Sequence, residues 1–301
     1  MSGKKRIHQM TNRQWETAFP SDDACKTYLM SNRWPLGVAC PRCGNAGVGE
    51  HGTKAFHWQC YACSGKGTSY RFSVLVGTIF ENTKYPLREW FRVIHLMLTS
   101  KKGISALQIH RMVGTGSYQT AWSMCHRIRA GLANEDFRKL MGVVEVDETY
   151  IGGDDDNRHF GKKQGTKWRD GKAIVVGAVE RKGKVVARVL DAVNTETLET
   201  FIYQTVGTDV SLLATDEHRA YQDLYRGGYK HGTVNHSKKR YVVGAIHTNT
   251  IEGFWSLIKR GVFGTFHKVS RKYLPLYVAE FQFRYNNRLN DDIFGTAIRG
   301  C

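Results

Sequence analysis

Three acidic residues are candidates for chemistry because each ends or interrupts a recognisable stretch of the chain. Asp147 closes an apolar run that begins at residue 143, Asp216 closes a run from 210, and Glu252 lies in a helix-like stretch at 249–260. Strands present carboxylates in a fixed direction, and a helix can bring a third carboxylate beside them. Converging carboxylates bind hard divalent cations such as Mg²⁺. Because paired cations cleave or join phosphodiester bonds, these residues predict a metal site that acts on nucleic acid.

The run at 143–151 alternates between the two faces of a predicted strand. Glu145 and Asp147 share one face, whereas Val144 and Val146 share the other. Periodicity alone does not choose between Glu145 and Asp147 as the metal ligand. Asp147 lies nearer the end of the strand, where ligand sites in open α/β sheets usually form. The pattern therefore favours Asp147 and leaves Glu145 as the alternative.

The other two acidic residues each have a structural alternative. Asp216 precedes a predicted helix, and Asp is a common helix N-cap. Glu252 lies on a polar helical face that it shares with Asn249, Ser256 and Lys259. Such a face is usually solvated. Glu252 and Lys259 on one helical face also fit a site in which the carboxylate binds a metal and the lysine binds a phosphate.

The net charge favours a polyanionic partner. Lys and Arg total 44 against 27 Asp and Glu, which gives a formal charge of +17 and a pI near 9.6. Each phosphate that a basic side chain neutralises releases counterions, which favours binding to nucleic acid. The basic residues around the acidic motifs that we predict to contact DNA are Lys238, Lys239, Arg240, Lys259 and Arg260. Charged runs are usually solvated surface, so a basic protein without a specific partner is the alternative.

Four of the seven cysteines predict a structural zinc site. Cys40 and Cys43 form one Cys-x-x-Cys pair, and Cys60 and Cys63 form a second after sixteen intervening residues. Two such turns present four thiolates to one tetrahedral Zn²⁺, which leaves no position open for catalysis. A redox pair or unrelated cysteines are the alternatives, and two spaced pairs argue against both. The sequence therefore predicts a zinc ribbon.

The segment at 84–132 predicts a helix-turn-helix. Residues 103–113 and 118–129 have helical patterns on either side of a Gly-containing turn, and Ser117 is the expected cap of the second helix. The first residues of such a second helix enter the major groove of DNA. The candidate DNA contacts are Tyr118, Gln119 and Ser123 for bases and Arg127 and Arg129 for the backbone. Helix pairs of this kind also occur for purely structural reasons.

The predicted elements divide the chain into four segments. A helical segment at 1–35 precedes the ribbon at 36–75, and the helix-turn-helix-like segment at 84–132 follows. From 143 to 290, β-branched runs at 143–151, 173–180, 184–190 and 210–215 are interspersed with helical patterns at 195–206, 249–260 and 272–289, which predicts a mixed α/β sheet domain. No stretch approaches 18 uninterrupted apolar residues and no secretory signal is recognisable. We therefore expect a cytoplasmic, nucleoid-associated protein with no membrane partner.

The chain resembles the insertion-sequence transposases that join an N-terminal zinc ribbon to an RNase H-like DDE catalytic domain, the ISXO2-like group. The resemblance rests on the four ribbon cysteines and on Val-Asp-Glu-Thr-Tyr-Ile-Gly-Gly at 146–153, Thr-Asp-Glu-His-Arg-Ala-Tyr at 215–221, His-Thr-Asn-Thr-Ile-Glu-Gly-Phe-Trp-Ser-Leu-Ile-Lys-Arg at 247–260 and Phe-Arg-Tyr-Asn-Asn-Arg at 283–288. It runs from about residue 20 to 290, and the motif at 247–260 is the most specific. It implies an RNase H-like mixed sheet behind the ribbon and the helical segment.

This resemblance also implies roles for particular residues. Asp147 and Asp216 are the implied ligands of two Mg²⁺ or Mn²⁺ ions, and Glu252 is the implied third carboxylate. Asn249, one helical turn earlier, can share or replace the role of Glu252, because related enzymes vary at the third position. Lys259, seven positions after Glu252, is the implied contact to DNA near the cleavage point.

The implied reaction is hydrolysis of DNA at the element end, followed by attack of the freed 3′-OH on target DNA. The implied partners are double-stranded DNA, as terminal inverted repeats and target, and further copies of the chain, because two ends must be paired. Two alternatives stay open: an RNase H-like metal-dependent nuclease or resolvase, and a catalytically inactive zinc-ribbon DNA-binding protein. The intact acidic set argues against the inactive protein, and the recognition segments in front of it argue against the nuclease.

Overall fold

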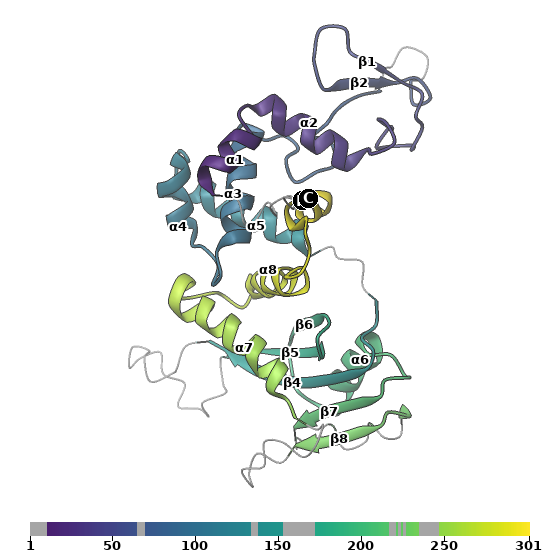
Figure 1. Cartoon of the computed structure of the whole chain (residues 1–301), viewed down its shortest axis with the longest axis vertical. Coiled ribbons are helices and arrows are strands. Elements are labelled where there is room, and N and C mark those ends of the chain that lie inside the picture. Colours follow the sequence, from purple (N-terminus) through teal and green to yellow (C-terminus); the bar gives the residue numbers. More distant parts are fainter. Residues whose placement is uncertain are drawn as a thin grey trace, which may run out of the picture. The chain divides into compact units, whose positions relative to one another are not determined.

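A computed structural model describes residues 11–64, 70–133, 138–152, 172–216, 221, 224, 227–234 and 247–301. The chain forms two compact units, which Figure 1 shows as ribbons. The ribbon–helix unit comprises Met1–Asn134 and Leu289–Cys301, and the sheet unit comprises Glu135–Arg288. The chain therefore passes from the first unit into the second and returns to the first at its end. None of the helices in the described parts combines the length and apolar character that a membrane crossing needs.

The sheet unit contains a five-stranded mixed sheet of order β6-β5-β4-β7-β8. Its strands are β4 (Val143–Ile151), β5 (Ala173–Glu180), β6 (Val185–Leu190), β7 (Leu212–Asp216) and β8 (His231–Val234). β4, β5 and β6 form an antiparallel meander, whereas β7 and β8 join β4 in parallel. Three antiparallel strands extended by two parallel ones form the RNase H-like sheet that the sequence predicted.

Helices cover both faces of this sheet. The helix α6 (Thr195–Thr205) packs on one face, where Val144 and Val146 of β4 meet Phe201 in a common core. On the other face lie α7 (Asn249–Gly261) and α8 (Leu274–Asn286), and α7 crosses the sheet in Figure 1. The alternation predicted for residues 143–151 is confirmed, because even-numbered valines face α6 and odd-numbered acidic residues face α7.

The ribbon–helix unit joins a small three-stranded sheet to a group of helices. The strands are β1 (Val48–Glu50), β2 (His57–Cys60) and β3 (Tyr70–Ser73), and the helices are α1 (Asn12–Ala18), α2 (Asp22–Arg33), α3 (Leu87–Thr99), α4 (Ala106–Ile109), α5 (Tyr118–Leu132) and α9 (Ile293–Gly300). Ser117 caps α5 as predicted, since its Oγ accepts a hydrogen bond from the backbone N–H of Thr120 at 3.1 Å. The helix expected at 103–113 is only partly α-helical. It continues from α4 as a π-helical turn that ends at Gly114, whose φ of 75° favours glycine.

The C-terminal helix α9 completes the core of the ribbon–helix unit, which the sequence analysis did not foresee. Phe294 of α9 lies within 6 Å of the rings of Phe19, Tyr28 and Phe91, which come from the first 91 residues. The backbone carbonyl of Cys301 also accepts a hydrogen bond from the N–H of Ile79 at 2.7 Å. The last residues are therefore part of a core built mainly from the start of the chain.

Replacing Phe294 by Ala is expected to lower the free energy of unfolding of the ribbon–helix unit by about 3–5 kcal/mol, because it leaves a cavity among aromatic rings. Tryptophan fluorescence during urea unfolding measures this effect, since Trp15 and Trp90 are buried in the same unit. The control is Leu289→Ala, because Leu289 is exposed. Equal stability of the two variants would contradict the assignment of α9 to this core.

Candidate metal sites and nucleic-acid surface

The four ribbon cysteines converge on one point. The Sγ atoms of Cys40 and Cys63 are 3.9 Å apart, and those of Cys43 and Cys60 are 3.7 Å apart. All four sulfurs lie within 4.8 Å of one another. Tetrahedral zinc with Zn–S bonds of about 2.3 Å places its sulfurs about 3.8 Å apart, so these distances fit the metal. The arrangement supports the structural zinc predicted from the sequence.

Backbone groups of the ribbon also favour thiolates. The N–H of Arg42 points to Cys40 Sγ and the N–H of Cys63 points to Cys60 Sγ, each at 3.4 Å. Around the site, Trp34 contacts the rings of Trp58 and Phe72 edge to face. The metal site and this small aromatic cluster together form the core of the ribbon.

The second convergence is acidic and lies in the sheet unit. Pairing between β4 and β7 ends at Glu145 and Ala214, and Asp147 and Asp216 each lie two residues beyond that last pair. Because the strands are parallel, equal offsets place the two carboxylates side by side. The carboxylate oxygens of Asp147, Glu148 and Asp216 lie within 4.8 Å of one another. We call these three residues the acidic cluster.

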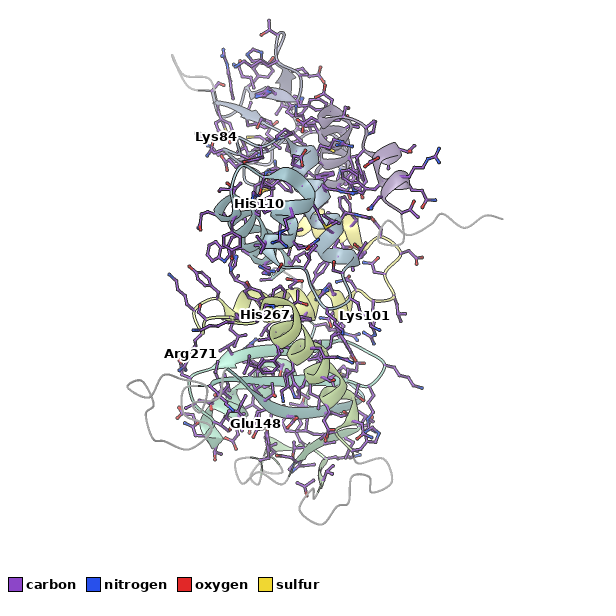
Figure 2. All side chains as sticks on the ribbon, turned by 90° about the vertical axis from the view of Figure 1, so that its left-hand side faces the viewer. Lys84, Lys101, His110, Glu148, His267 and Arg271 are labelled. Carbon is purple, nitrogen blue, oxygen red and sulfur yellow. The ribbon has the colours of Figure 1, made fainter. Side chains whose placement is uncertain are left out.

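Glu148 was missed by sequence reasoning. Alternation places it on the face opposite Asp147, yet its carboxylate reaches the cluster at the unpaired edge of β4. The hydroxyl of Tyr221 donates a hydrogen bond to Glu148 Oε2 at 2.8 Å. Tyr221 itself is buried. Figure 2 marks Glu148 on the sheet unit. The sequence signal was the adjacent pair Asp147–Glu148, which strand periodicity alone discounts.

Asp147 is electrostatically strained in the absence of a cation. Burial, followed by repulsion from Glu148 and Asp216, raises the pKa of the Asp147 carboxyl to about 7. The indole Nε1 of Trp255 donates a hydrogen bond to Asp147 Oδ2 at 3.0 Å and acts in the opposite direction. Carboxylates that repel one another in a partly buried site are a donor set suited to a divalent cation.

Helix α7 brings the remaining predicted residues to this face of the sheet. Glu252 and Asn249 are both exposed in its first turn, and Glu252 is not a member of the acidic cluster. Glu252 Oε1 accepts a hydrogen bond from Thr248 Oγ1 at 2.9 Å. Trp255, one turn after Glu252, contacts Asp147 directly. The structure thus brings Asp147 and Asp216 together and places Glu252 one helical turn from Trp255, which contacts Asp147.

Close packing holds α7 on the sheet. Gly177 of β5 is paired with Asp147, and a Cβ added at Gly177 would lie 2.6 Å from the Trp255 ring and 3.1 Å from Ile251 Cδ1. A side chain at this position must therefore displace the helix. The absence of a side chain at Gly177 lets Trp255 reach Asp147.

Glu145, the alternative ligand in the sequence analysis, has a different set of partners. Its side chain has no exposed surface, and its carboxylate is bonded to the first turn of α7 and to Arg181. These donors occupy its oxygens, so it has no position to offer a cation. The structure therefore separates the two candidates that periodicity could not, because Asp147 joins the acidic cluster and Glu145 binds a helix.

The predicted base-reading residues surround a hollow beside α5. Tyr118, Gln119 and Ser123 are exposed, and Gln119 and Ser123 line a hollow of about 320 Å³. Lys84, labelled in Figure 2, and Arg127 contribute positive charge to its lining. Arg127 also lies over the Trp90 ring at 5.2 Å, which fixes its side chain against the unit. The first turns of α5 therefore present polar and basic groups at a concave surface.

The expectation for Arg129 is not supported. Its side chain is only 1% exposed, within the core of the ribbon–helix unit, and it is not available to a DNA backbone. Arg129 lies two residues after Arg127 on α5, so helical rotation carries it away from the surface that Arg127 reaches.

The basic residues near α7 are described only in part. Lys259 is half-buried at the end of α7, and Arg260 is exposed there with its Nε bonded to the carbonyl of Ser256 at 3.1 Å. Both lie in the last turn, where positive charge is favourable at a helix C-terminus. Lys238, Lys239 and Arg240 lie outside the described residues.

Without added metal, ionisation of Asp147 is expected to reduce the free energy of unfolding as pH rises from about 4 to 7, and Asp147→Asn should lack this contribution. The raised pKa of Asp147 means that the folded state retains a proton that the unfolded state releases in this window, so the free energy of unfolding falls with pH. Mg²⁺ favours the charged carboxylate and should therefore raise the Tm more at pH 8 than at pH 6. Thermal denaturation measures both effects. The same pH and Mg²⁺ dependence in Asp147→Asn would contradict this assignment.

Comparisons with known proteins identify both units. Residues 139–286 match the family model of the ISXO2-like transposase domain, and residues 20–66 match that of the transposase zinc-ribbon domain. A protein from the transposable element ISH50 of Halobacterium salinarum is 28% identical over 276 residues, which cover 88% of this chain and 91% of that protein.

A solved structure also matches the fold weakly. It is a chain from the simian T-cell lymphotropic virus intasome in complex with the PP2A regulatory subunit B56 gamma. The match has a TM-score of 0.32 and 16% identity, and it covers 62% of this chain and 66%, just under two thirds, of the other. Similarity at this level assigns no activity.

Proposed function

Because this chain belongs to the insertion-sequence transposases that carry a transposase zinc ribbon and an ISXO2-like transposase domain, we propose that it cuts DNA at the ends of its element and joins the freed 3′-OH to target DNA. The observation that carries this proposal is the convergence of Asp147 and Asp216 at the unpaired edge between β4 and β7, inside the matched transposase domain. The sequence alone also predicts both residues as metal ligands.

The acidic cluster supplies the chemistry in this proposal. Asp147 and Asp216 hold the catalytic cations, and Glu148 adds negative charge beside them while Tyr221 fixes its carboxylate. Mg²⁺ or Mn²⁺ held by Asp147 and Asp216 would supply Lewis-acid activation of the attacking hydroxyl group and charge stabilisation of the leaving 3′ oxygen. Trp255 orients Asp147 through its indole N–H.

Helical phase favours Glu252 over Asn249 as the third metal ligand. Trp255 marks the line of α7 that faces the acidic cluster. At about 100° per residue, Glu252 and Lys259 lie about 60° and 40° from that line on the same side, whereas Asn249 lies about 120° away. To turn toward the cluster, Glu252 must first change rotamer and break its hydrogen bond with Thr248. Lys259, in the same stripe, contacts DNA next to the cleavage point.

DNA recognition in this proposal lies in the ribbon–helix unit. Gln119 and Ser123 at the hollow beside α5 read bases of the terminal repeat, and Lys84 and Arg127 bind the backbone around it. Base readers at the start of a helix fit the usual approach of such helices to the major groove. Pairing of two element ends requires at least two copies of the chain on DNA, so the active species is a homo-oligomer.

The test compares purified wild-type protein with Asp216→Ala on labelled element-end DNA and a target plasmid in Mn²⁺. Joined products from the wild type only are expected. If the wild type cleaves the element-end DNA but joins it to no target, the nuclease or resolvase is favoured. Binding without cleavage or joining in either protein leaves the inactive DNA-binding protein as the better account.

A further inference from the structure

The carboxylate of Glu145 caps α7 from a strand that lies more than a hundred residues earlier in the chain. Glu145 Oε2 accepts hydrogen bonds from the backbone N–H groups of Thr250 at 2.8 Å and Ile251 at 3.1 Å. These N–H groups belong to the first turn of α7, which has no partners for them within the helix. The negative charge also lies at the positive end of the helix dipole.

The other oxygen of Glu145 ties this helix start to its surroundings. Glu145 Oε1 accepts hydrogen bonds from Thr250 Oγ1 at 2.8 Å and Arg181 Nε at 2.6 Å. Arg181 in turn donates to the backbone carbonyl of His247 at 3.0 Å, and His247 Nδ1 lies 3.3 Å from Glu145 Oε1. One buried carboxylate therefore connects β4, the turn after β5 and the entry to α7.

The usual local cap of α7 is absent, which leaves this task to Glu145. Thr248 occupies the N-cap position, but its side chain makes no capping bond to the helix backbone. Its hydroxyl instead donates to Glu252 Oε1 at 2.9 Å. Thr and similar residues normally satisfy the first N–H groups themselves. The start of α7 is thus fixed by the strand that carries Asp147.

Two contacts between β4 and α7 set the register of the pair. Glu145 binds the N–H of Ile251, and Asp147 accepts from Trp255. Two residues of strand span about 6.7 Å and four residues of helix span about 6 Å, so the similar spacing lets both contacts form at once. A slip or rotation of α7 breaks both contacts and changes the position of Glu252 relative to the acidic cluster.

We propose that Glu145 is a positioning residue for the metal site: by capping α7 it fixes the height and rotation at which the helix presents its third ligand to Asp147 and Asp216. The inference rests on the proposed function, because it assigns α7 a ligand. Glu145 touches neither cation nor DNA. It acts through the first turn of α7, as outer groups at metal sites orient the residues that bind the metal.

The test measures Mn²⁺ affinity by calorimetry in Glu145→Gln, with exposed Glu196→Gln as the matched control. Gln has the same size but loses the charge and directs an N–H₂ group at existing donors. The dissociation constant for Mn²⁺ is expected to rise about 10–100-fold in Glu145→Gln and to stay unchanged in Glu196→Gln. DNA cleavage by Glu145→Gln should then recover at high Mn²⁺ concentration. It would not recover if the variant had lost activity only because part of it is unfolded.

A second variant keeps the test decisive if Glu145→Gln fails to fold. Thr250→Val removes only the hydroxyl that donates to Glu145 Oε1, and it should weaken Mn²⁺ binding in the same direction by a smaller factor. Unchanged Mn²⁺ affinity in a folded Glu145→Gln, or in Thr250→Val if the first variant is unfolded, overturns the inference. If the wild type binds Mn²⁺ but does not join DNA, the proposed function is overturned instead. The Mn²⁺ affinities of the variants then still test the role of Glu145.

Discussion

Replacing Asp147 by Asn is expected to reduce metal-dependent cleavage of element-end DNA about 10³-fold or more. The substitution removes one of the charges that hold the cations, and metal stabilisation of the transition state contributes several kcal/mol, with each 1.36 kcal/mol worth about tenfold in rate. Asn keeps an oxygen that can accept the hydrogen bond from Trp255, so the contact to α7 and the fold should survive. Single-turnover cleavage of labelled DNA in Mg²⁺ measures the effect.

The control for Asp147→Asn is Asp191→Asn, because Asp191 is a fully exposed carboxylate that pairs with Arg271 at 2.8 Å on the surface. This control should cleave at the wild-type rate. Circular dichroism and gel-shift assays check that Asp147→Asn is folded and binds the same DNA. A cleavage rate within about tenfold of the wild type would contradict the assignment of Asp147 to the catalytic site.

Replacing Cys60 by Ser is expected to remove zinc and to unfold the ribbon. Structural zinc sites contribute about 10–16 kcal/mol at neutral pH, and a sheet as small as β1–β3 has too little apolar core to fold without it. Zinc content by mass spectrometry should fall from one per chain to near zero. The near-ultraviolet signal of Trp58, buried in the ribbon, should be lost at the same time.

Cys63→His is the matched control for the ribbon. A Cys₃His set also binds zinc tetrahedrally, so this variant should keep its metal and the Trp58 signal. If Cys60→Ser retained zinc and a folded ribbon, the cysteines would not form the site. Gel shifts with element-end DNA then show whether the ribbon takes part in recognition, because the helices around α5 bury apolar residues of their own, such as Phe91 and Ile128.

Much of the sheet unit could be predicted because strand patterns are local. The runs at 143–151 and 173–180 were placed to the residue, since β-branched residues alternate clearly there. Asp147 and Asp216 were recognisable as site residues because each closes such a run and each falls in a motif of the family. Their proximity depended on the parallel pairing of β4 and β7, which no local pattern reveals.

Other features depend on contacts between distant residues. The residues next to Glu145 in the sequence do not indicate that it caps a helix that begins at Asn249. The residues next to Gly177 do not indicate that the Trp255 ring packs where its side chain would be. Glu148 was missed because alternation places it on the face opposite Asp147, and its carboxylate reaches the acidic cluster where β7 no longer pairs with β4. Arg129 was misplaced because a basic residue on a helix was assumed to face solvent.

The central claim is that this chain joins a DNA 3′-OH to a second DNA molecule. The most direct test uses pre-cut element-end DNA that carries either a 3′-OH or a 3′-deoxy terminus, with target plasmid and Mg²⁺. We expect joined products from the 3′-OH end only, linked through that hydroxyl to a target 5′-phosphate, and none from Asp147→Asn. Equal products from both ends, or target nicking without joining from either, would contradict it.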